Sequence, residues 1–297
     1  MSMKIPVAAL AAALTVVGAF PADRPSNANP FAKNNLIAWC IVPFDAAHRG
    51  PVERAQMLKR LGITRLAYDW RDKDIPTFDQ EVDALKKYGI KLQSFWLTSG
   101  PDPASENGVR AVLDVLRRRK LKTEIWYMFR PPAGFDALSQ DEKVAMAAKA
   151  VKYLAGEAQK LHCKVGVYNH GGWYGEPENE LAILNAVTMP NVGMVYNFSH
   201  GQAQIDRFPE FFPKILPHLL ALNIDGMKKE GPRIIPVGEG TSELEMLKLV
   251  RASGFKGPVG ILNEAADRDA EVGLAGNIAG LQKVLRTMGD EAALKTY

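Results

Sequence analysis

The sequence predicts a single (β/α)8 barrel, and three observations carry this prediction. Short apolar runs alternate with helical stretches from residue 36 onward, without a break in the alternation. Eight such pairs occur, which is the number that closes a parallel barrel. An open doubly wound sheet, the main alternative, usually has fewer units and a glycine-rich phosphate loop after its first strand. Here WCIVPFDAAHRG stands in that place, without a GxGxxG pattern, so the barrel is favoured.

In the first half of the chain, proline, glycine and capping residues mark the expected helix ends. Pro51 starts the first helix and Gly62 stops it, while Gly89 closes the second. Ser139 and Glu142 form a capping box at the start of a long fourth helix. The expected strands of this half are residues 36–42, 65–70, 91–97 and 123–129, followed by helices at residues 52–61, 78–88, 107–119 and 140–162.

The second half keeps the alternation, but its connections are less regular. Pro209 and Pro213 are expected to break the helix after the sixth strand, because proline lacks the backbone N–H of a helix interior. A charged Lys/Gly/Pro loop at residues 228–233 precedes a short strand-like piece at residues 234–237, and the chain ends in a tail. The expected strands are residues 164–168, 192–198, 219–224 and 259–262, followed by helices at residues 178–189, 205–214, 242–252 and 269–288.

The composition is that of a soluble globular protein, except at the N-terminus. Apolar residues make up 47% and charged residues 24%, with a formal net charge of +4. The densest basic run, RRRKLK at residues 117–122, has no interleaved aromatic residues, which argues against nucleic-acid binding. Residues 5–20 are apolar and uncharged after a short start with Lys4, a layout that predicts a secretory signal peptide over residues 1–22. An uncleaved membrane anchor is the alternative, although the run is short for a membrane span.

These segments suggest a simple organisation. Residues 23–35 are rich in proline, asparagine and serine and are expected to form a linker, and residues 36–290 are expected to form the barrel. The mature protein is expected to be secreted or periplasmic, without a membrane span. Cys40 and Cys163 lie in or beside expected strands and show no metal-ligand spacing, so both are expected to be buried free thiols without a catalytic role.

Polar and aromatic residues collect at the expected strand ends, where barrel enzymes place their chemistry. His170 and His200 follow neighbouring strands in glycine-flanked turns and are expected to contact substrate or transfer protons. Glu239 lies between two glycines, and Glu264 follows the last strand. Indole rings suit the apolar faces of sugars, while amides and acids suit hydroxyl groups, so the expected ligand is a small carbohydrate. The other expected substrate-binding residues are Tyr168, Asn169, Trp173, Asn197, Asn223, Asp225, Trp96 and Arg130.

These strand ends resemble those of the xylose isomerase-like TIM-barrel superfamily of sugar isomerases and epimerases. The resemblance covers about residues 36–285 and rests on YNHGG, NFSHG, NIDGM, VGEG and the final Glu264. It implies a divalent metal at the positions of Tyr168, Asn197, Asn223 and Glu264, where the family usually has Glu, Asp, His and Glu. Only Glu264 keeps its type, so the resemblance implies either no metal or a weakly bound Mn, Mg or Zn ion.

Three functions remain open at this point. The first is an enzyme that abstracts a proton next to the carbonyl of a sugar or keto-sugar, as an isomerase, an epimerase or a lyase. Glu264 or Glu239 would be its base, and His170 and His200 would polarise oxygens or shuttle protons. The second is a sugar-binding protein that lost catalysis together with its metal. The third is a metal-dependent hydrolase that uses the same four residues as ligands.

Overall fold

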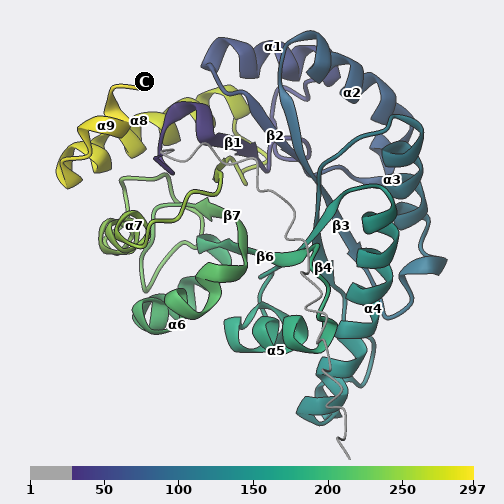
Figure 1. Cartoon of the computed structure of the whole chain (residues 1–297). Coiled ribbons are helices and arrows are strands. Elements are labelled where there is room, and N and C mark those ends of the chain that lie inside the picture. Colours follow the sequence, from purple (N-terminus) through teal and green to yellow (C-terminus); the bar gives the residue numbers. More distant parts are fainter. Residues whose placement is uncertain (1–28) are drawn as a thin grey trace, which may run out of the picture.

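Eight short strands pair side by side in chain order, and β8 pairs with β1 to close a parallel barrel (Figure 1). The computed structural model describes residues 29–297. The predicted (β/α)8 fold is confirmed. The predicted signal peptide and the first part of the predicted linker, up to residue 28, lie outside the described residues. The strands are β1 (Leu36–Trp39), β2 (Arg65–Tyr68), β3 (Lys91–Ser99), β4 (Glu124–Phe129), β5 (Lys164–Tyr168), β6 (Val192–Asn197), β7 (Leu219–Ile224) and β8 (Val259–Leu262).

Helices surround the barrel and cover its strands (Figure 1). The α-helices are α1 (Pro51–Leu61), α2 (Phe78–Lys87), α3 (Asn107–Arg118), α4 (Gln140–Lys160), α5 (Pro177–Val187), α6 (Phe208–Ile215), α7 (Glu243–Ala252), α8 (Ala270–Met288) and α9 (Glu291–Leu294). Short 3-10 helices fill several connections: η1 (Lys33–Asn35), η2 (Asp72–Thr77), η3 (Pro103–Ser105), η4 (Phe135–Ala137), η5 (Trp173–Gly175), η6 (Phe198–Arg207) and η7 (Leu216–His218).

Three expectations for local structure need correction. The first strand ends at Trp39 rather than at residue 42, because Cys40 has a φ of 53° and leaves the extended conformation. Pro209 and Pro213 do not break α6. Pro209 lies in the first helical turn, where a backbone N–H has no helical partner, and Pro213 is accommodated inside the helix. Residues 234–237 form no strand but only an isolated bridge between Ile235 and Gly226.

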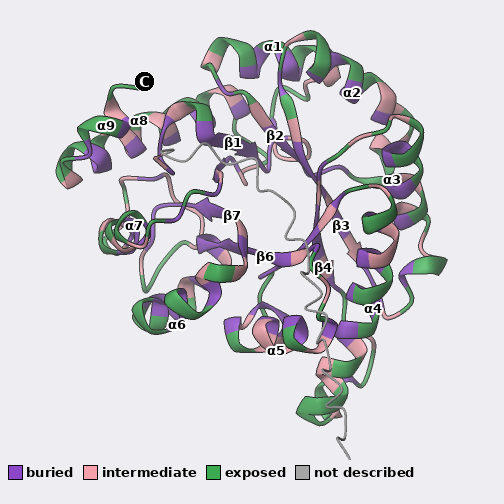
Figure 2. Cartoon of the chain, viewed as in Figure 1, coloured by how far each residue is buried: buried purple, intermediate pink, exposed green. Residues whose placement is uncertain are grey.

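The core has two parts, which follow from the alternation of side chains along each strand. Outward-facing residues such as Leu36 and Ala38 pack with the buried faces of the helices, which Figure 2 shows as stripes toward the barrel. Inward-facing residues form a smaller cluster that includes Trp39, Trp126 and Tyr168. The centroids of the two indole rings are 5.1 Å apart. Large aromatic rings therefore fill the inside of the barrel below its carboxyl end.

The two ends of the described chain pack together. Asn29 donates from Nδ2 to both carboxylate oxygens of Asp290, and the hydroxyl of Tyr297 donates to the carbonyl of Phe31 at 2.8 Å. Phe31 is fully buried, so residues 29–35 pack on the barrel. Both cysteines are buried free thiols, as predicted. Between residues 29 and 297, no helix is both long and apolar enough to cross a membrane.

Candidate functional site

A cavity of about 70 Å³ opens at the carboxyl ends of the strands. We call it the central cavity. Five predicted site residues meet in its wall: Trp96, Tyr168, His170, His200 and Glu264. Residues from the ends of β1 and β2 complete it: Trp39, Cys40, Phe44, Asp69 and Arg71. The strand ends thus bring together side chains that are up to 225 positions apart (264 − 39 = 225).

A wider groove of about 740 Å³ lies beside the central cavity, and we call it the side groove. Residues at the ends of β2, β3 and β4 line most of it. Arg71, Trp96 and His170 line both spaces, so the groove and the cavity adjoin. Arg130, a predicted binding residue, lies in the groove wall, where its Nη2 is 2.6 Å from Oε1 of Glu106. A ligand that extends from the cavity into the groove would pass Trp96 and His170.

The hydroxyl of Tyr168 accepts two hydrogen bonds. Nε1 of Trp39 donates to it at 3.0 Å, and Nδ2 of Asn197 donates at 2.7 Å. Burial raises the pKa of Tyr168 well above its ordinary value, so the phenol stays neutral and keeps its proton. Because both neighbours are donors, the hydrogen of the phenol itself can be donated to another group. Tyr168 therefore presents a neutral O–H where the family would have a carboxylate.

The side-chain amides of Asn169 and Asn197 form hydrogen bonds with other groups of the protein. Oδ1 of Asn197 accepts from the backbone N–H of Ser199 at 3.0 Å and from its hydroxyl at 3.1 Å, so Nδ2 must be the atom that faces Tyr168. Oδ1 of Asn169 accepts from the backbone N–H of Asn197 at 2.6 Å, and its Nδ2 donates to the carbonyl of Asn197 at 3.0 Å. These bonds join the ends of β5 and β6 and hold Tyr168 in place.

His170 and His200 lie against each other, with ring centroids 4.2 Å apart. The ring of Trp96 packs on His170 at 5.4 Å. Burial, together with the nearby His170 and Arg233, lowers the pKa of His200 to about 2. Partial burial also lowers the pKa of His170, although Glu264 opposes this shift. Both imidazoles are therefore neutral near pH 7, and each offers one donor and one acceptor nitrogen.

The turns after β5 and β6 explain how both histidines reach the cavity. Gly171 and Gly172 have φ values of 80° and 60°, in the left-handed region where only glycine is unstrained. They reverse the chain directly after His170. After β6, the side chain of Asn197 caps η6, and His200 lies within this helix. The pattern NHGG and the pattern NFSHG therefore each position one imidazole.

Arg233 enters the site from the loop between β7 and α7. Its Nη1 lies 3.2 Å from Nδ1 of His200 and 3.3 Å from Oγ of Ser199, and its Nη2 lies 3.0 Å from Oε1 of Glu264. A guanidinium group only donates, so Nδ1 of His200 is the acceptor and the ring hydrogen resides on Nε2. The ion pair orients the carboxylate of Glu264. The other oxygen, Oε2, is buried and has no hydrogen-bond partner within residues 29–297.

Further buried polar groups lie at the ends of β2 and β7. Both amide atoms of Asn223, Oδ2 of Asp225 and Oδ2 of Asp69 lack hydrogen-bond partners in the described part of the chain. Burial raises the pKa of Asp225 well above its ordinary value, with a further contribution from Glu264, and burial raises the pKa of Asp69 to about 6. A Cβ atom at Gly260 would lie 1.9 Å from Oδ1 of Asn223, so glycine leaves room for this amide. Unpaired buried polar atoms are uncommon in folded proteins, so these atoms call for partners such as ordered waters or a bound ligand.

Six predicted site residues line neither the central cavity nor the side groove: Asn169, Trp173, Asn197, Asn223, Asp225 and Glu239. Two of them, Glu239 and Trp173, lie in surroundings that the sequence did not predict. Glu239 is exposed, in a turn where its backbone N–H donates to the carbonyl of Pro236 at 3.2 Å. Trp173 begins η5 and packs on the ring of Phe135 at 5.4 Å, while its Nε1 donates to Oε1 of Gln140 at 2.8 Å. Their Gly-rich sequence contexts favoured a site role, but the chain turns both side chains to other surroundings.

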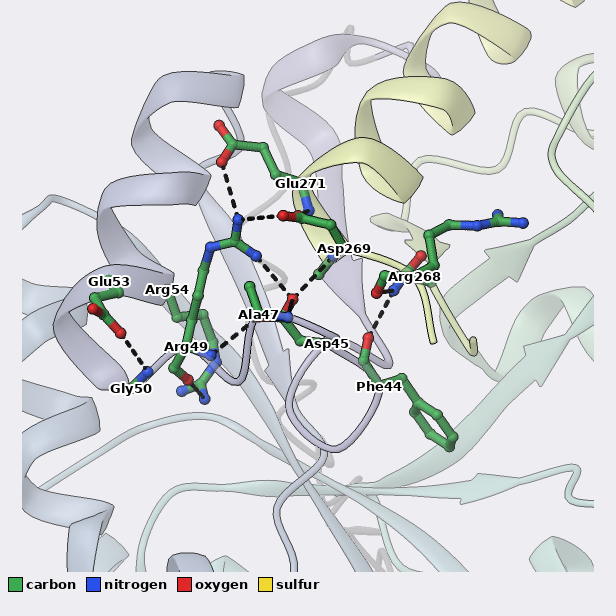
Figure 3. A network of polar contacts seen from close by, with 12 residues as sticks. Phe44, Asp45, Ala47, Arg49, Gly50, Glu53, Arg54, Arg268, Asp269 and Glu271 are labelled. Atoms are coloured by element: carbon green, nitrogen blue, oxygen red, sulfur yellow. Dashed lines mark hydrogen bonds and ion pairs between the residues drawn. The ribbon is translucent and has the colours of Figure 1, made fainter. Parts of the chain in front are cut away.

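The loop between β1 and α1 forms part of the rim of the site and is tied to the start of α8. Figure 3 shows Arg49 reaching from this loop toward Asp45 and Asp269; its Nη1 is 2.8 Å from Asp45 and its Nη2 is 2.9 Å from Asp269. Asp45 also accepts from the first backbone N–H of α8 at 3.1 Å. Nδ2 of Asn263, just after β8, donates to the carbonyl of Phe44 at 2.7 Å. These bonds hold Phe44, which lines the central cavity, next to the end of β8.

Sequence reasoning did not select Arg233, Asp69 or Arg71 as site residues. Asp69 and Arg71 follow β2, so their place at a strand end was an available signal. Arg233 lies in a charged loop that resembles many solvated loops. Its partner Glu264 is 31 positions further along the chain, and no spacing rule connects them.

The positions at which the family holds a divalent metal do not fit one here. The hydroxyl of Tyr168 is neutral and already accepts two hydrogen bonds, and Oδ1 of Asn197 is used by Ser199. Oε1 of Glu264 pairs with the positively charged Arg233. Across residues 29–297, no three His, Cys, Asp or Glu side chains converge in a way that could hold a metal ion. The hydrolase ligand set considered above is not assembled either, because Glu239 lies outside the central cavity.

Comparison with known families gives a match over most of the chain. The family profile described as the xylose isomerase-like TIM barrel matches residues 53–286. No curated protein matches the sequence significantly.

Several solved structures share the fold. The 3-keto-D-glucoside 4-epimerase YcjR from E. coli aligns with a TM-score of 0.64 at 15% identity, over 86% of this chain and all 100% of that one. The protein IolI with a bound zinc atom aligns with a TM-score of 0.63 at 14% identity, over 85% of this chain and 98% of that one. The probable 3-DHS dehydratase AsbF from Bacillus anthracis aligns with a TM-score of 0.60 at 16% identity, over 84% of this chain and 98% of that one. At these sequence identities, the structural similarity shows a shared fold and no more.

Proposed function

The chain belongs to the xylose isomerase-like TIM-barrel family, and we propose that it is a carbohydrate-active enzyme that moves a proton on a carbon next to a carbonyl group. One observation carries the proposal. A carboxylate with a free oxygen, two neutral imidazoles and a phenol O–H line one cavity at the carboxyl end of the barrel. Isomerisation, epimerisation and elimination all begin with the proton abstraction that such a set performs.

Glu264 is the base in this proposal. Arg233 holds its Oε1, and its buried Oε2 has no hydrogen-bond partner within the described chain, so the lone pairs of this oxygen are not committed to another protein group. Glu239, the other carboxylate considered from the sequence, is exposed and outside the central cavity. The structural neighbours support this class of chemistry, because one of them is a keto-sugar epimerase and another is a probable dehydratase.

The groups around Glu264 can stabilise the charge that develops on the carbonyl oxygen. His200 carries its hydrogen on Nε2, because Nδ1 accepts from Arg233. Tyr168 offers its own O–H, because both of its neighbours donate to it. Donors that are fixed in place before the reaction stabilise an enolate at little reorganisation cost. Neutral His170 can then return the proton to carbon or deliver it to a leaving oxygen.

The side groove supports a substrate that is larger than the reacting group alone. The central cavity has a volume of only about 70 Å³, whereas the adjoining groove has about 740 Å³, within the range of ligand pockets. Trp96 stands between them and offers an aromatic face to a sugar ring. We place the carbonyl end of the substrate in the cavity and the rest of the carbohydrate in the groove. The N-terminal sequence supports export, so we propose a secreted or periplasmic enzyme.

Proton exchange from solvent tests this function. The protein is incubated in D₂O with a panel of keto-sugars and keto-glycosides, and deuterium on carbon is followed by NMR. We expect the wild-type chain to incorporate deuterium and Glu264→Gln to lower the rate about 10²- to 10⁴-fold. Glu239→Gln is the matched control and should keep the wild-type rate, because its side chain is outside the cavity.

The alternative function, a sugar-binding protein without catalysis, predicts a different outcome. In that case the wild-type chain would bind a sugar of the panel without exchanging a proton, and Glu264→Gln would leave the affinity unchanged. This result would replace the enzymatic function by the binding function.

A further inference from the structure

We infer that Arg233 is the permanent cation of this site and takes the electrostatic role that a divalent metal has in the family. The catalytic part of this inference rests on the proposed function. The other part, that Arg233 occupies the place of a metal ion, does not depend on that function. The guanidinium group contacts Glu264, which is the one residue of the family ligand type that the chain retains. It also contacts His200 and Ser199 after β6.

The loop that carries Arg233 is anchored on both sides. Before it, Nε2 of Gln202 donates to the carbonyl of Lys228 at 2.9 Å. After it, Ile235 pairs with Gly226, whose backbone N–H donates to the carbonyl of Ile235 at 3.0 Å. The direction from which the guanidinium group enters the site is therefore set by the backbone, and its charge is in place before substrate arrives.

Three hydrogen bonds to protein groups use some of the N–H donors of Arg233. Both hydrogens of Nη1 are taken by Oγ of Ser199 and Nδ1 of His200, and one hydrogen of Nη2 is taken by Oε1 of Glu264. A guanidinium group has five N–H donors. The second hydrogen of Nη2 and the hydrogen of Nε remain, and the side chain is 39% exposed. A substrate oxygen can therefore bind to Arg233 without displacing its protein partners.

The same contacts exclude a metal ion from this place. A divalent cation next to Glu264 would stand within a few ångströms of a fixed positive charge and would be repelled. The lone pairs that a metal needs are also committed, since Nδ1 of His200 accepts from Arg233 and Oδ1 of Asn197 accepts from Ser199. Replacement of the family carboxylates by Tyr168 and Asn197 removes two negative charges that would attract a divalent ion, and it leaves the single carboxylate of Glu264 opposite the single positive charge of Arg233.

The chemistry balances without a metal or an external redox partner. Oε2 of Glu264 takes the proton from the carbon beside the carbonyl, the C–H electron pair forms a C=C bond, and the carbonyl oxygen becomes an enolate oxygen. Arg233 and Tyr168 donate hydrogen bonds to this oxygen. His170 supplies a proton to the same carbon, or to a leaving oxygen as its C–O bond breaks, and takes a proton back from solvent as Glu264 releases its own proton to solvent. If the neighbouring carbon receives the proton instead, the hydroxyl hydrogen of the enediol moves to the former carbonyl oxygen. The ligand class is thus a neutral carbohydrate with a carbonyl group, bound by N–H and O–H donors.

Metal content is the first test, and it needs no knowledge of the substrate. The wild-type chain is produced in medium supplemented with Mn²⁺ and Zn²⁺, and its metal content is measured by mass spectrometry. We expect no stoichiometric metal, and no rise of Tm on addition of either ion compared with EDTA. A stoichiometric metal, or a clear rise of Tm with Mn²⁺ or Zn²⁺, would overturn the inference.

Substitution of Arg233 is the second test. Arg233→Ala should lower the rate of proton exchange about 10²- to 10³-fold, the usual loss for one donor to a developing oxyanion. Added guanidinium salt should restore part of the rate, and EDTA should not change the wild-type rate. Arg207→Ala is the matched control, since Arg207 pairs with Glu176 and Glu178 at the surface, and neither guanidinium nor EDTA should affect it.

The outcomes separate this inference from the proposed function. An unchanged rate in Arg233→Ala, with an unchanged Tm, would overturn the role of Arg233. Loss of the wild-type exchange rate in EDTA, with recovery on addition of a metal, would do the same. If no sugar of the panel exchanges a proton with the wild-type chain, the proposed function fails, and the metal content alone then decides whether Arg233 replaces the metal.

Discussion

Tyr168 is the residue at which this chain departs most clearly from its family. The family position calls for a carboxylate that binds metal, and Tyr168 instead offers a neutral phenol in a fully buried setting. Its two donors, Trp39 and Asn197, leave its own hydrogen available. In the proposed function, hydrogen bonds from such neutral donors stabilise the charge that a metal ion stabilises elsewhere in the family.

Tyr168→Phe separates the hydroxyl from the ring. The change leaves two buried donors without an acceptor, which costs about 1–3 kcal/mol of unfolding free energy. It also removes a donor to the enolate, so the exchange rate should fall about 10²-fold or more. Both quantities are measured, by urea unfolding and by deuterium incorporation. Tyr127→Phe removes a buried hydroxyl that bonds to Ser99 and should lower stability without lowering the exchange rate; equal losses of rate in both variants would argue against the role of Tyr168.

The pKa of His200 predicts a loss of stability at acid pH. In the folded protein its pKa is about 2, against an ordinary value of 6.5. Below pH 6.5 the unfolded chain gains a proton here that the folded chain does not, so the unfolding free energy falls as the pH falls from about 6.5 toward 2. Asp69 acts in the opposite sense, because its pKa is raised from 3.8 to about 6 and its contribution is lost as the pH rises through that range.

His200→Asn should therefore make the protein less sensitive to acid. Between pH 7 and pH 5 the wild-type chain should lose about 1–2 kcal/mol more unfolding free energy than this variant. Urea unfolding at both pH values measures the difference. His48→Asn, at an exposed loop position, is the control and should keep the wild-type pH dependence. Equal acid sensitivity of wild type and His200→Asn would contradict a buried neutral imidazole.

At the scale of elements, the connection between β1 and α1 is fastened to α8 (Figure 3). Asp45 is the centre of this connection, since it accepts from Arg49 and from the first backbone N–H of α8. The side chain of Asp45 is 2% exposed and that of Arg49 is 13% exposed. A buried ion pair of this kind is strongly destabilising when one partner is removed, because the other charge is left uncompensated.

Asp45→Ala should cost about 3–5 kcal/mol of unfolding free energy, measured by urea unfolding. It should also loosen Phe44 at the edge of the central cavity and weaken sugar binding. Arg60→Ala removes an exposed partner of Glu271 on the same face and should leave both stability and binding close to wild type. A small effect of Asp45→Ala, equal to that of Arg60→Ala, would show that the network does not hold the loop.

The elements could be predicted well from the sequence, and the reasons are local. Alternation of apolar runs and helical stretches specified all eight strands, and Gly62 and Ser139 marked helix ends that the structure retains. Two details of local structure could not be predicted from the sequence. Cys40 has a φ of 53°, and no pattern of side chains in the sequence predicts this backbone conformation. The helix α6 continues past Pro213, because a single missing hydrogen bond is tolerated in a short packed helix.

At the scale of the whole molecule, closure of the barrel explains how much of the site the sequence could reveal. Side chains directly after strands, such as His170, His200 and Glu264, meet because all strand ends meet. Arg233 could not be found this way, because it lies in a long loop and meets His200 and Glu264 only through tertiary contacts. Glu239 and Trp173 lie near strand ends in sequence, yet their turns direct them away from the cavity.

The whole molecule also offers more space than one reacting group needs. The central cavity and the side groove share Arg71, Trp96 and His170, so one carbohydrate can occupy both. This arrangement joins the small central cavity to a larger groove that can hold the rest of the proposed ligand. The proton transfer is the central claim of the proposed function.

Deuterium incorporation into a keto-glycoside, followed by NMR with wild type and Glu264→Gln in parallel, measures this transfer most directly. The account predicts that deuterium appears only on carbon next to the carbonyl group, that the rate falls about 10²- to 10⁴-fold in Glu264→Gln, and that EDTA leaves the wild-type rate unchanged. Tight binding of the sugar by the wild-type chain, with no deuterium on carbon in any member of the panel, would contradict it.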